Sequence, residues 1–402
     1  MALRVAYLSH YAELYGANRS LIDLVLELRA RREVEPLVIA PREGPLLELL
    51  RGEQVECAVF PFEPWMSERH YEGRFYHKWK QWLGYERAAG ARARRNTGVI
   101  PELTALLNAE GIQLVHANSV AVSVALAGAK AAKIPLVQHV REMPEKHYRL
   151  HLDMGRSGYG DVLRSASRVI AISNAAAADV KRYALDARID VVYNGVLRAT
   201  RYAEVFANSA TRWQSTTPFR FVMVGLLHPG KRYDEAVDAL RIVREKGHDA
   251  RLSIAGGGRD KDLIMHIHRA GLAPFIDLLG FVEDPFPLFA KSHALIMCSR
   301  DEAMGRVTVE AMASGLPVIG HASGGTPELI ADGITGMLYH DGAEELAQRM
   351  LQLIADPANA RAIGERAATS ASQRFSVERY ATSVLEVYRS VLSRAETSPQ
   401  RR

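Results

Sequence analysis

Cysteine is almost absent from this chain. Only Cys57 and Cys298 occur among its 402 residues, so neither a disulfide framework nor a cysteine metal cluster can be built from it. No run approaches the roughly eighteen apolar residues that cross a bilayer, and the opening MALRVAYLSH lacks the apolar stretch and cleavage site of a signal peptide. These absences lead us to expect a cytoplasmic protein, in which any contact with the inner face of the membrane must be peripheral.

A strong excess of one charge is also missing. The 51 Lys and Arg residues and the 46 Asp and Glu residues give a formal net charge of +5. This modest basic balance suits an anionic small substrate or an anionic membrane surface better than a nucleic acid. We therefore expect no nucleic-acid partner.

What the sequence does contain is an alternation of apolar, β-branched runs with helical patterns. A length of 402 residues favours two domains, each with its own core, and the alternation is typical of parallel strands covered by helices. The predicted strands are 4–8, 36–40, 114–116, 134–140, 168–172 and 190–192 in the first half, and 219–224, 251–255, 276–279, 294–297 and 317–319 in the second.

The polar stretch 209–218 interrupts this regularity and is predicted to be the linker between the halves. We therefore expect an α/β protein with a first domain over 1–197, a second over 217–375, and a C-terminal helix over 376–394 that packs back towards the first domain. Ligands of open parallel sheets bind beyond the carboxyl ends of the strands. Motifs in the loops at those ends are therefore the ones that carry function.

The strongest signal is the segment EAMGRVTVEAMASGLP, in which Glu302 and Glu310 stand eight residues apart. Gly305 lets the backbone approach a ligand before a helix opens near Val307, where backbone N–H groups can bind an anion. Two acids near a helix start are ordinarily favourable dipole placement on a solvated surface. Here Glu310 lies in the apolar run 307–313, where a carboxylate is costly unless a polar group meets it. We therefore interpret the segment as a ligand site.

This segment resembles the E-x7-E motif of retaining glycosyltransferase family four, and the resemblance covers nearly the whole chain. It implies the GT-B architecture, two Rossmann-like domains that face a central cleft, and retaining transfer of a hexosyl-type sugar from a nucleotide-diphosphate sugar to an acceptor. It also implies that Glu302 contacts the donor sugar and that Glu310 binds the ribose. The loop residues implied to face the sugar and the diphosphate are Met304, Gly305, Arg306 and Val307.

A second motif, VGLLHPGKR, follows the first predicted strand of the second half. Gly225 ends that strand, and Lys231 sits where a helix begins and can neutralise a diphosphate; a Pro-Gly turn with surface charges is the alternative interpretation. The motif resembles the family's G-R-L-x-x-x-K-G pattern, whose Arg and Lys hold the donor phosphates. Leu226 replaces that Arg, and Arg232 or Arg306 would then supply the missing charge.

The resemblance places the nucleotide base beside two further loops, which contain Gly257 and the pair Phe281 and Val282. In the first half, YGANRS opens a helix after the first strand, and Gly16 is the implied donor contact there. A single glycine is not the G-x-G-x-x-G fingerprint, which argues against a nicotinamide-dependent oxidoreductase. The expected donor-binding residues are therefore Gly16, Gly225, Lys231, Arg232, Gly257, Phe281, Val282, Glu302, Met304, Gly305, Arg306, Val307 and Glu310.

One D-x-D pair could be mistaken for a metal site. Asp260 and Asp262 sit where a helix begins after a run of glycines, so charge placement at a helix N-terminus explains them better than metal binding. We expect no metal and no cofactor, with the donor phosphates met by Lys231, Arg side chains and helix N-termini.

The strand ends of the first half carry the expected acceptor side. HAN at 116–118 resembles the family's H-A-H or H-A-N strand end, and QHVRE at 138–142 resembles a V-H-D segment in which Arg141 takes the usual His position. His139 lies two residues earlier, on the same strand face. The expected acceptor-side residues are Asn18, His116, Asn118, His139 and Arg141, and the expected catalytic residues are Glu302, Lys231, His139 and Arg141. A buried structural histidine stays the alternative for both His116 and His139.

An enzyme is not the only function compatible with these motifs. The resemblance favours hexosyl transfer to a saccharide or lipid-linked acceptor, in cell-surface polysaccharide or glycolipid synthesis. Because Leu226 and Arg141 depart from the family pattern, a non-catalytic nucleotide-sugar-binding subunit of a glycosylation complex is the alternative.

An aromatic and basic excursion spans residues 65–95. It contains Trp65, Trp79 and Trp82, three of the chain's four tryptophans. Either a helix packs its aromatic stripe onto the first domain, or the excursion holds a lipid-linked or polyanionic acceptor, at the cytoplasmic surface of the membrane in its sharpest form. Its basic residues are Arg74, Lys78, Lys80, Arg87, Arg92, Arg94 and Arg95.

Overall fold

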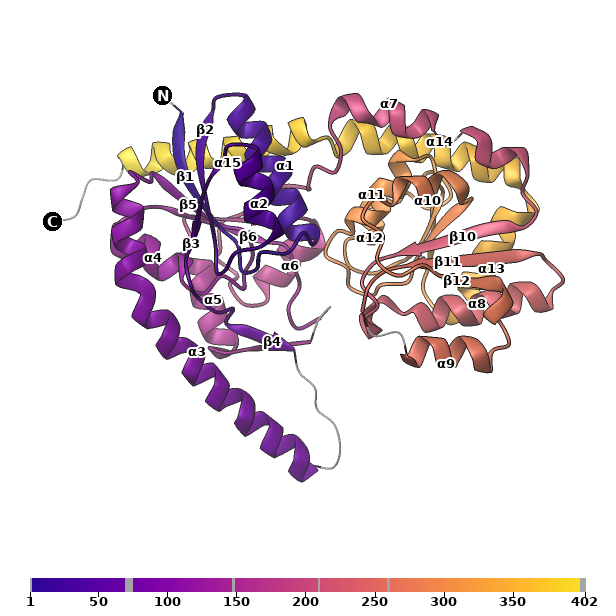
Figure 1. Ribbon diagram of the computed structural model, residues 1–402, viewed down its shortest axis with the longest axis horizontal. Coiled ribbons are helices and arrows are strands. Elements are labelled where there is room, and N and C mark those ends of the chain that lie inside the picture. The colour runs from indigo at the N-terminus through magenta and orange to yellow at the C-terminus, as the bar shows by residue number, and fades with distance from the viewer. Residues whose placement is uncertain (1, 69–74, 147–148, 209, 259–260, 398–402) are drawn as a thin grey trace. The chain divides into compact units, whose positions relative to one another are not determined.

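The computed structural model describes residues 2–68, 75–146, 149–208, 210–258 and 261–397, so Arg74 and Asp260 lie outside the described residues. Contacts divide the chain into two units (Figure 1). Unit 1 comprises Met1–Gly195 and Val377–Arg402, and unit 2 comprises Val196–Ser376. Within the described ranges, no helix combines the length and the apolar character that crossing a bilayer requires.

Unit 1 is built on a parallel sheet with the strand order β3-β2-β1-β5-β6-β8-β9. Its strands are β1 (Leu3–Leu8), β2 (Val34–Ala40), β3 (Glu56–Val59), β5 (Leu114–Ala117), β6 (Leu136–Val140), β8 (Arg168–Ala171) and β9 (Ile189–Val191). The chain proceeds from β1 to one edge of the sheet and then from β5 to the other. The loops after β1 and β5 therefore diverge, which is where such sheets bind ligands.

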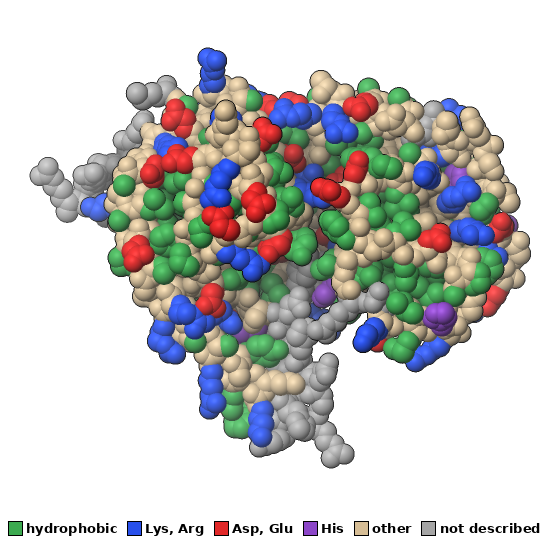
Figure 2. Space-filling model, viewed as in Figure 1, with side chains coloured by type: hydrophobic (Ala, Val, Ile, Leu, Met, Phe, Trp, Pro, Cys, Tyr) green, Lys and Arg blue, Asp and Glu red, His purple; other side chains and the backbone are tan. Residues whose placement is uncertain are grey.

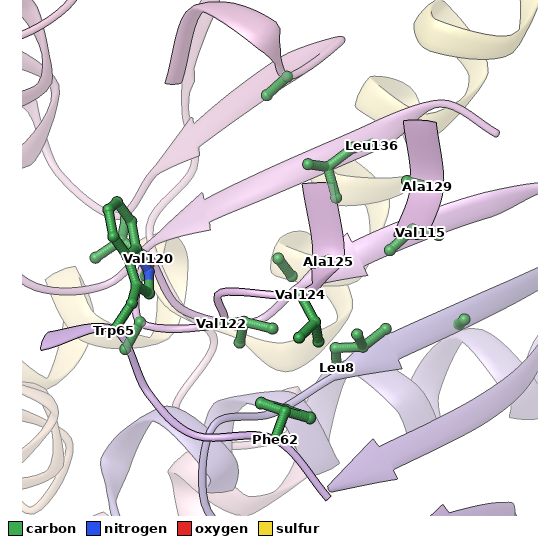
Figure 3. Close-up of a cluster of buried hydrophobic side chains, with 14 of the residues drawn as sticks. Leu8, Phe62, Trp65, Val115, Val120, Val122, Val124, Ala125, Ala129 and Leu136 are labelled. Carbon is green, nitrogen blue, oxygen red and sulfur yellow. The ribbon is translucent and has the colours of Figure 1, made fainter. Parts of the chain in front are cut away.

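Helices cover both faces of this sheet (Figure 1). They are α1 (Gly16–Ala30), α2 (Pro45–Gly52), α3 (Phe75–Ala109), α4 (Ala125–Ala132), α5 (Gly155–Ser165), α6 (Asn174–Lys181) and α15 (Val377–Thr397). Because successive strand residues point to opposite faces, Leu8 and Val115 belong to one core (Figure 3), whereas Tyr7 and Tyr388 belong to the other. The last helix of the chain, α15, is thus part of the second core of unit 1 and packs on α1.

The excursion over 65–95 forms a short strand and the beginning of a long helix. The strand β4 (Met66–Glu68) pairs antiparallel with β7 (Leu150–Leu152), and α3 then continues through Pro101 to Ala109. Trp65 is buried, and its indole Nε1 donates a hydrogen bond to Val120 O at 2.5 Å (Figure 3).

Farther along the excursion, in α3, two of the tryptophans are exposed. Trp79 and Trp82 are 50% and 43% exposed. The interpretation that the aromatic stripe packs onto the first domain is therefore wrong for these two residues. The side chains of 75–78, including Lys78, lie outside the described residues.

Unit 2 repeats the same plan with a parallel sheet of order β12-β11-β10-β13-β14-β15. Its strands are β10 (Phe219–Val224), β11 (Ala250–Ala255), β12 (Ile276–Leu278), β13 (Ala294–Met297), β14 (Val318–His321) and β15 (Met337–Tyr339). The covering helices are α8 (Tyr233–Glu245), α9 (Lys261–Arg269), α10 (Phe286–Lys291), α11 (Arg306–Ala313), α12 (Thr326–Leu329), α13 (Gly342–Ala355) and α14 (Pro357–Arg374). Here the loops after β10 and β13 diverge. The predicted α/β class with parallel sheets in two domains is confirmed.

The stretch 209–218, predicted to be the linker, is instead part of unit 2. It follows α7 (Ala199–Ala207) and contains the 3-10 turn η1 (Ala210–Gln214). Buried Arg212 donates from Nη2 to Ser314 O at 2.6 Å, and the ring of buried His293 contacts Arg212 O at 2.9 Å. The predicted linker position is therefore wrong, because polar composition also describes a segment whose backbone groups are met inside a core.

Candidate functional site

The predicted site residues gather at the carboxyl edges of the two sheets. Unit 1 carries Gly16, Asn18, His116, Asn118, His139 and Arg141, and unit 2 carries Gly225, Lys231, Arg232, Gly257, Phe281, Val282, Glu302, Met304, Gly305, Arg306, Val307 and Glu310. In both units the divergent loops lie at the end where open parallel sheets bind ligands.

Lys231 and Glu302 meet at the divergence point of unit 2. Lys231 ends the turn η2 (Pro229–Lys231) after β10, and Glu302 lies in the loop after β13, the neighbouring strand. Lys231 Nζ lies 2.6 Å from Glu302 Oε2, and the two side chains keep 19% and 14% of their surface accessible. A short, charge-assisted hydrogen bond of this kind is strong and directional. The pair therefore presents an ammonium that can meet a phosphate beside a carboxylate that can accept from hydroxyls.

The loop that carries Glu302 is shaped by close backbone contact with the loop after β14. Gly325 N donates to Glu302 O at 2.7 Å. A Cβ at Gly324 would lie 2.4 Å from Glu302 O, and one at Gly325 would lie 2.3 Å from Ala303 O. Only residues without a side chain permit this approach, so the Gly-Gly pair fixes where the Glu302 backbone sits.

The helix α11 begins directly after this loop. Gly305 precedes it with a left-handed φ of 80°, a conformation that glycine adopts without strain. On the first turn of the helix, Arg306 Nη2 donates to Val196 O at 3.3 Å, and Arg306 Nε lies 3.6 Å from Glu310 Oε1. The polar group that the buried Glu310 requires is therefore supplied in part by the chain itself. Of the other predicted loop residues, Met304 is buried and Val307 is half-buried.

Arg232 pairs with the acids of its own helix. Its guanidinium lies 3.2 Å from Asp234 Oδ1 and 3.2 Å from Glu235 Oε2. The hydrogen bond to Asp234 raises the pKa of Arg232 above its usual value. With Arg232 engaged in this way and Leu226 apolar, Lys231 is the basic residue of this loop that stands beside Glu302.

Glycines join the strand-end loops of β10, β11 and β12. Leu227 N donates to Gly257 O at 2.8 Å, and Gly256 N donates to Gly280 O at 2.7 Å. A Cβ at Gly256 would lie 1.8 Å from Gly225 O, so these loops pack backbone against backbone. They form a continuous shelf at the carboxyl edge of the sheet.

Phe281 stands on this shelf and is 70% exposed, while the adjacent Val282 is half-buried. An exposed aromatic ring can stack on a planar partner such as a heterocyclic base. Asp262 lies in the first turn of α9, as expected for helix-dipole placement. In the part of the chain that the structure describes, no group of three or more His, Cys, Asp or Glu side chains is arranged to hold a metal ion.

In unit 1, buried Asn18 shapes the loop between β1 and α1. Its amide nitrogen donates to Tyr11 O at 3.0 Å and to Glu13 O at 2.8 Å, and its oxygen accepts from Ser9 Oγ at 2.6 Å. Asn118 Nδ2, at the end of β5, lies 3.3 Å from the same oxygen. Asn18 and Asn118 therefore join the two divergent loops.

Gly16, the predicted donor contact of unit 1, is the first residue of α1 and is exposed. The preceding Tyr15 is exposed as well, and its ring makes an edge contact with Tyr11 at 5.7 Å between centroids. Both residues lie at the carboxyl edge of the unit 1 sheet, where a ligand can reach them.

His116 and His139 lie fully buried on the face of the sheet that α15 covers. His116 Nε2 is 3.1 Å from His139 Nδ1, and Tyr388 OH is 2.7 Å from His116 Nδ1. Burial, with the nearby charge of Arg141, holds the pKa of both imidazoles well below its usual range. Arg141 Nη2 donates to His139 Nδ1 at 3.3 Å, so this nitrogen is an acceptor and His116 Nε2 must donate to it. The geometry favours the alternative that these are neutral, structural histidines.

Arg141 is also enclosed, with 7% of its surface exposed. Its Nε donates to Asn118 O and Oδ1 at 3.1 and 2.8 Å, its Nη1 to Asn194 Oδ1 at 2.7 Å, and its Nη2 to Tyr380 OH at 2.8 Å. Each nitrogen of the guanidinium therefore already has a partner within unit 1, where the family resemblance implied a contact with acceptor or sugar.

Glu142 is a candidate that the sequence motifs did not single out. It follows Arg141 and accepts a hydrogen bond from Ser119 Oγ, so it bridges the loops after β5 and β6. Burial raises its pKa to about 7, which suits a group that exchanges a proton near neutral pH. The sequence signal that could have indicated Glu142 is its position directly after Arg141. Adjacent side chains of an extended segment point to opposite sides, so the two residues face different surroundings.

The sequence models of two protein families match successive parts of the chain. "Glycosyltransferase Family 4" matches residues 15–197, which lie almost entirely in unit 1, and "Glycosyl transferases group 1" matches residues 208–370, which lie in unit 2. Together the two matches leave only short segments of the chain uncovered.

Curated relatives match over part of their length. N-acetyl-alpha-D-glucosaminyl L-malate synthase of Bacillus anthracis is 34% identical over 168 residues, which cover 40% of this chain and 43% of the relative. D-inositol 3-phosphate glycosyltransferase of Segniliparus rotundus is 28% identical over 256 residues, which cover 61% of this chain and 57% of the relative. The chain thus spans about half the length of these curated relatives.

Solved structures share the fold over nearly the whole chain. HepE of Anabaena, in complex with UDP-glucose, has a TM-score of 0.76 at 25% identity and covers 96% of this chain with 100% of its own. WaaG, a glycosyltransferase involved in lipopolysaccharide biosynthesis, has a TM-score of 0.67 at 16% identity and covers 95% of this chain with 99% of its own. From the two family matches and this shared GT-B fold, the chain belongs to glycosyltransferase family four.

Proposed function

We propose that this chain transfers a hexosyl-type sugar from a nucleotide-diphosphate sugar to an acceptor, with retention of the anomeric configuration. The observation that carries the proposal is the Lys231–Glu302 pair at the divergence point of unit 2. It combines a cation for the diphosphate with a carboxylate for sugar hydroxyls, directly before the N-terminus of α11, which favours negative charge.

Each residue of this edge has a role in the proposed reaction. Lys231 and the first-turn amides of α11 stabilise the charge that develops on the departing diphosphate, a contribution that is large where water is excluded. Glu302 accepts hydrogen bonds from the donor sugar, and Glu310 accepts them from the ribose. Phe281 stacks on the base. No side chain acts as a nucleophile, because the acceptor oxygen bonds to the anomeric carbon on the face from which the diphosphate departs. An oxygen of that diphosphate takes the acceptor's proton.

The comparisons suggest which substrates to try first. HepE has been solved with UDP-glucose, which makes UDP-glucose the first donor to test. The names of the curated relatives point to different acceptors, L-malate in one and inositol 3-phosphate in the other. For this chain we propose a saccharide or lipid-linked acceptor and reaction without a divalent cation.

Calorimetric titration with a panel of nucleotide sugars tests the donor half of the proposal. One member of the panel should bind at the unit 2 edge, and at 100 times its Kd it should raise the free energy of unfolding by about 2.7 kcal/mol. Release of the free nucleoside diphosphate in the presence of acceptor then tests turnover. Failure of every nucleotide sugar to bind would overturn the proposal.

A non-catalytic nucleotide-sugar-binding subunit is the second candidate. The observations that favour it are the exposed, apolar Leu226 where the family has an Arg, and the enclosure of Arg141 by partners within unit 1. The titration and the turnover assay separate the two functions. A donor that binds but is never cleaved, with water or any acceptor of the panel, supports the subunit.

We further propose that α3 contacts an anionic membrane surface. Trp79 and Trp82 are exposed near basic residues that are exposed as well, and Lys and Arg side chains gather over this part of the chain (Figure 2). Exposed aromatic and basic side chains on one helix are typical of interfacial binding, to which each basic residue adds about 1 kcal/mol. The exposed basic residues with described side chains there are Lys80, Arg87, Arg94 and Arg95.

Two basic residues of α3 pair with acids elsewhere in unit 1. Arg92 donates from Nε and Nη2 to the carboxylate of Asp153 at 2.7 and 2.6 Å, and Arg95 pairs with Glu63. The variant for co-sedimentation with anionic vesicles is the triple Ala substitution of Lys80, Arg87 and Arg94, with Arg95→Ala, whose exposed guanidinium is paired with Glu63, as control. Membrane binding should be lost in the triple variant and at high salt. Binding that resists both would contradict this contact.

A further inference from the structure

The chain crosses between its two units at two places. The first crossing is at Gly195 and Val196, and the second is at Ser376 and Val377. On the unit 2 side the two are joined directly, because Val196 N donates to Phe375 O at 2.9 Å. Any rearrangement of one unit against the other must be taken up in these two segments.

On the unit 1 side one residue holds both crossings. Arg141 Nη1 donates to Asn194 Oδ1, one residue before Gly195, and Arg141 Nη2 donates to Tyr380 OH, in the first turn of α15. Its Nε binds the carbonyl and the side-chain oxygen of Asn118 in the loop after β5. A single guanidinium thus connects a strand-end loop to the start of one crossing and the end of the other.

The residue type fits this connecting task. Arg141 is buried, and its hydrogen-bond partners are neutral oxygens and an imidazole nitrogen, while the carboxyl group of the adjacent Glu142 attracts its charge. A planar fork with five donors can satisfy several acceptors in fixed directions, which neither an ammonium nor an imidazole can do. A buried cation is costly unless such hydrogen bonds are complete.

We propose that Arg141 is a positioning residue that ties both chain crossings to the strand-end loops of unit 1, and that it does not contact a substrate. The conformation of the crossings is then linked to that of the Asn118 loop. The expected effect of Arg141 on turnover rests on the proposed transferase function. The expected effect on the two crossings does not.

Two kinds of measurement distinguish positioning from substrate contact. Hydrogen–deuterium exchange at residues 190–196 and 376–384 should become faster in Arg141→Met, on the order of tenfold or more, because charged hydrogen bonds to both segments are lost. Arg141→Lys should recover part of the protection. In turnover, kcat should fall while KM for UDP-glucose stays within about twofold, because Lys231 and Glu302 are untouched.

Tyr388→Phe is the matched control, since Tyr388 lies on the same helix and hydrogen-bonds to His116 rather than to Arg141. Exchange at residues 190–196 should be unchanged in it. Tyr380→Phe and Asn194→Ala each remove one partner of Arg141 and should loosen their own segment, which keeps the test available if Arg141→Met does not fold. In a double-mutant cycle, Arg141→Met and Tyr380→Phe should be non-additive.

Unchanged exchange at both segments in Arg141→Met and Arg141→Lys would overturn the proposal. A raised KM for UDP-glucose with unchanged kcat would overturn it as well, because it would place Arg141 in contact with the donor. If no nucleotide sugar binds at all, the proposed function fails, while the exchange result still decides whether Arg141 holds the crossings.

Discussion

The carboxyl edges of the two sheets share one topology but differ in where their polar groups point. In unit 2 the ion pair of Lys231 and Glu302 stays partly accessible, beside exposed Phe281. In unit 1 the equivalent strand ends bury His116, His139 and Arg141 under α15.

The additional helix explains this difference. The sheet face beside α1 is closed by α15, whose Tyr380 and Tyr388 accept and donate hydrogen bonds that would otherwise go to water or to a ligand. Motif positions that are equivalent in a family can therefore serve a ligand in one chain and the core in another. The four predictions below test this contrast.

The largest effect is expected at the accessible edge of unit 2. Lys231→Ala should weaken binding of UDP-glucose by about 1.5 to 3 kcal/mol, because it removes a charge-assisted hydrogen bond to the diphosphate. Calorimetry measures the change. Arg232→Ala is the matched control, since its guanidinium is engaged by Asp234 and Glu235. Equal losses in the two variants would show that the loop acts only through its net charge.

The closely packed glycine loops of unit 2 should not tolerate a side chain added at their closest contact. Gly256→Ala places a Cβ 1.8 Å from Gly225 O and should lower the free energy of unfolding by about 1 to 3 kcal/mol, as measured by urea denaturation. At Gly257 an added Cβ would meet Phe281 Cβ at an ordinary 3.7 Å. Gly257→Ala should therefore be much milder, and a reversed order would mean that the loops do not pack backbone against backbone.

The buried histidines of unit 1 predict a pH dependence of stability. The folded pKa of His139 lies well below its unfolded value of about 6.5, so below that pH the unfolded chain binds a proton that the folded one excludes. The contribution of His139 to the free energy of unfolding should fall with decreasing pH, by up to about 1.4 kcal/mol per pH unit below 6.5.

His139→Gln provides the comparison for this pH dependence. Its free energy of unfolding should fall less steeply than that of the unaltered protein between pH 7.5 and 5, because it lacks one of the proton-excluding groups. Burial lowers the pKa of His10 and His116 too, and both residues are present in the variant, so their contributions should be common to the two proteins. Parallel pH profiles would indicate that His139 is protonated in the folded state and faces an accessible site.

The smallest effect should come from removing metal ions. A chelator should leave the Kd for UDP-glucose and the rate of nucleoside diphosphate release unchanged, because Lys231 and the N-terminus of α11 are proposed to meet the phosphate charge. The matched measurement adds Mg²⁺ or Mn²⁺ in excess. Activity that disappears with chelator and returns with either ion would contradict the proposal.

Much of the fold could be predicted because buried parallel strands have sequences of continuous apolar residues. The predicted strand 219–224 is β10, and 294–297 is β13. The strands β3, β4, β7 and β15, of three or four residues each, fall outside the predictions. The edge strands β9 and β12 are as short and were predicted, so neither length nor edge position alone decides which strands a sequence reveals.

The unit 2 part of the candidate site was also accessible to prediction. Its motifs are local: Glu302, Gly305 and Glu310 lie within one loop and one helix, and Lys231 follows a neighbouring strand, so the sheet topology brings them together. The ion pairs of Arg232 with Asp234 and Glu235 were not predicted. Arg232 has a left-handed backbone conformation, so its side chain and that of its neighbour in the sequence can point in different directions.

By itself, the sequence determined two α/β halves, the family, and the set of residues that gather at the strand ends. Only the tertiary structure decided what those residues face. The hydrogen bonds of Arg141 to Tyr380 and of His116 to Tyr388 join positions 239 and 272 residues apart. No local pattern encodes them, because whether a polar side chain meets a ligand or a core depends on which distant helix covers it.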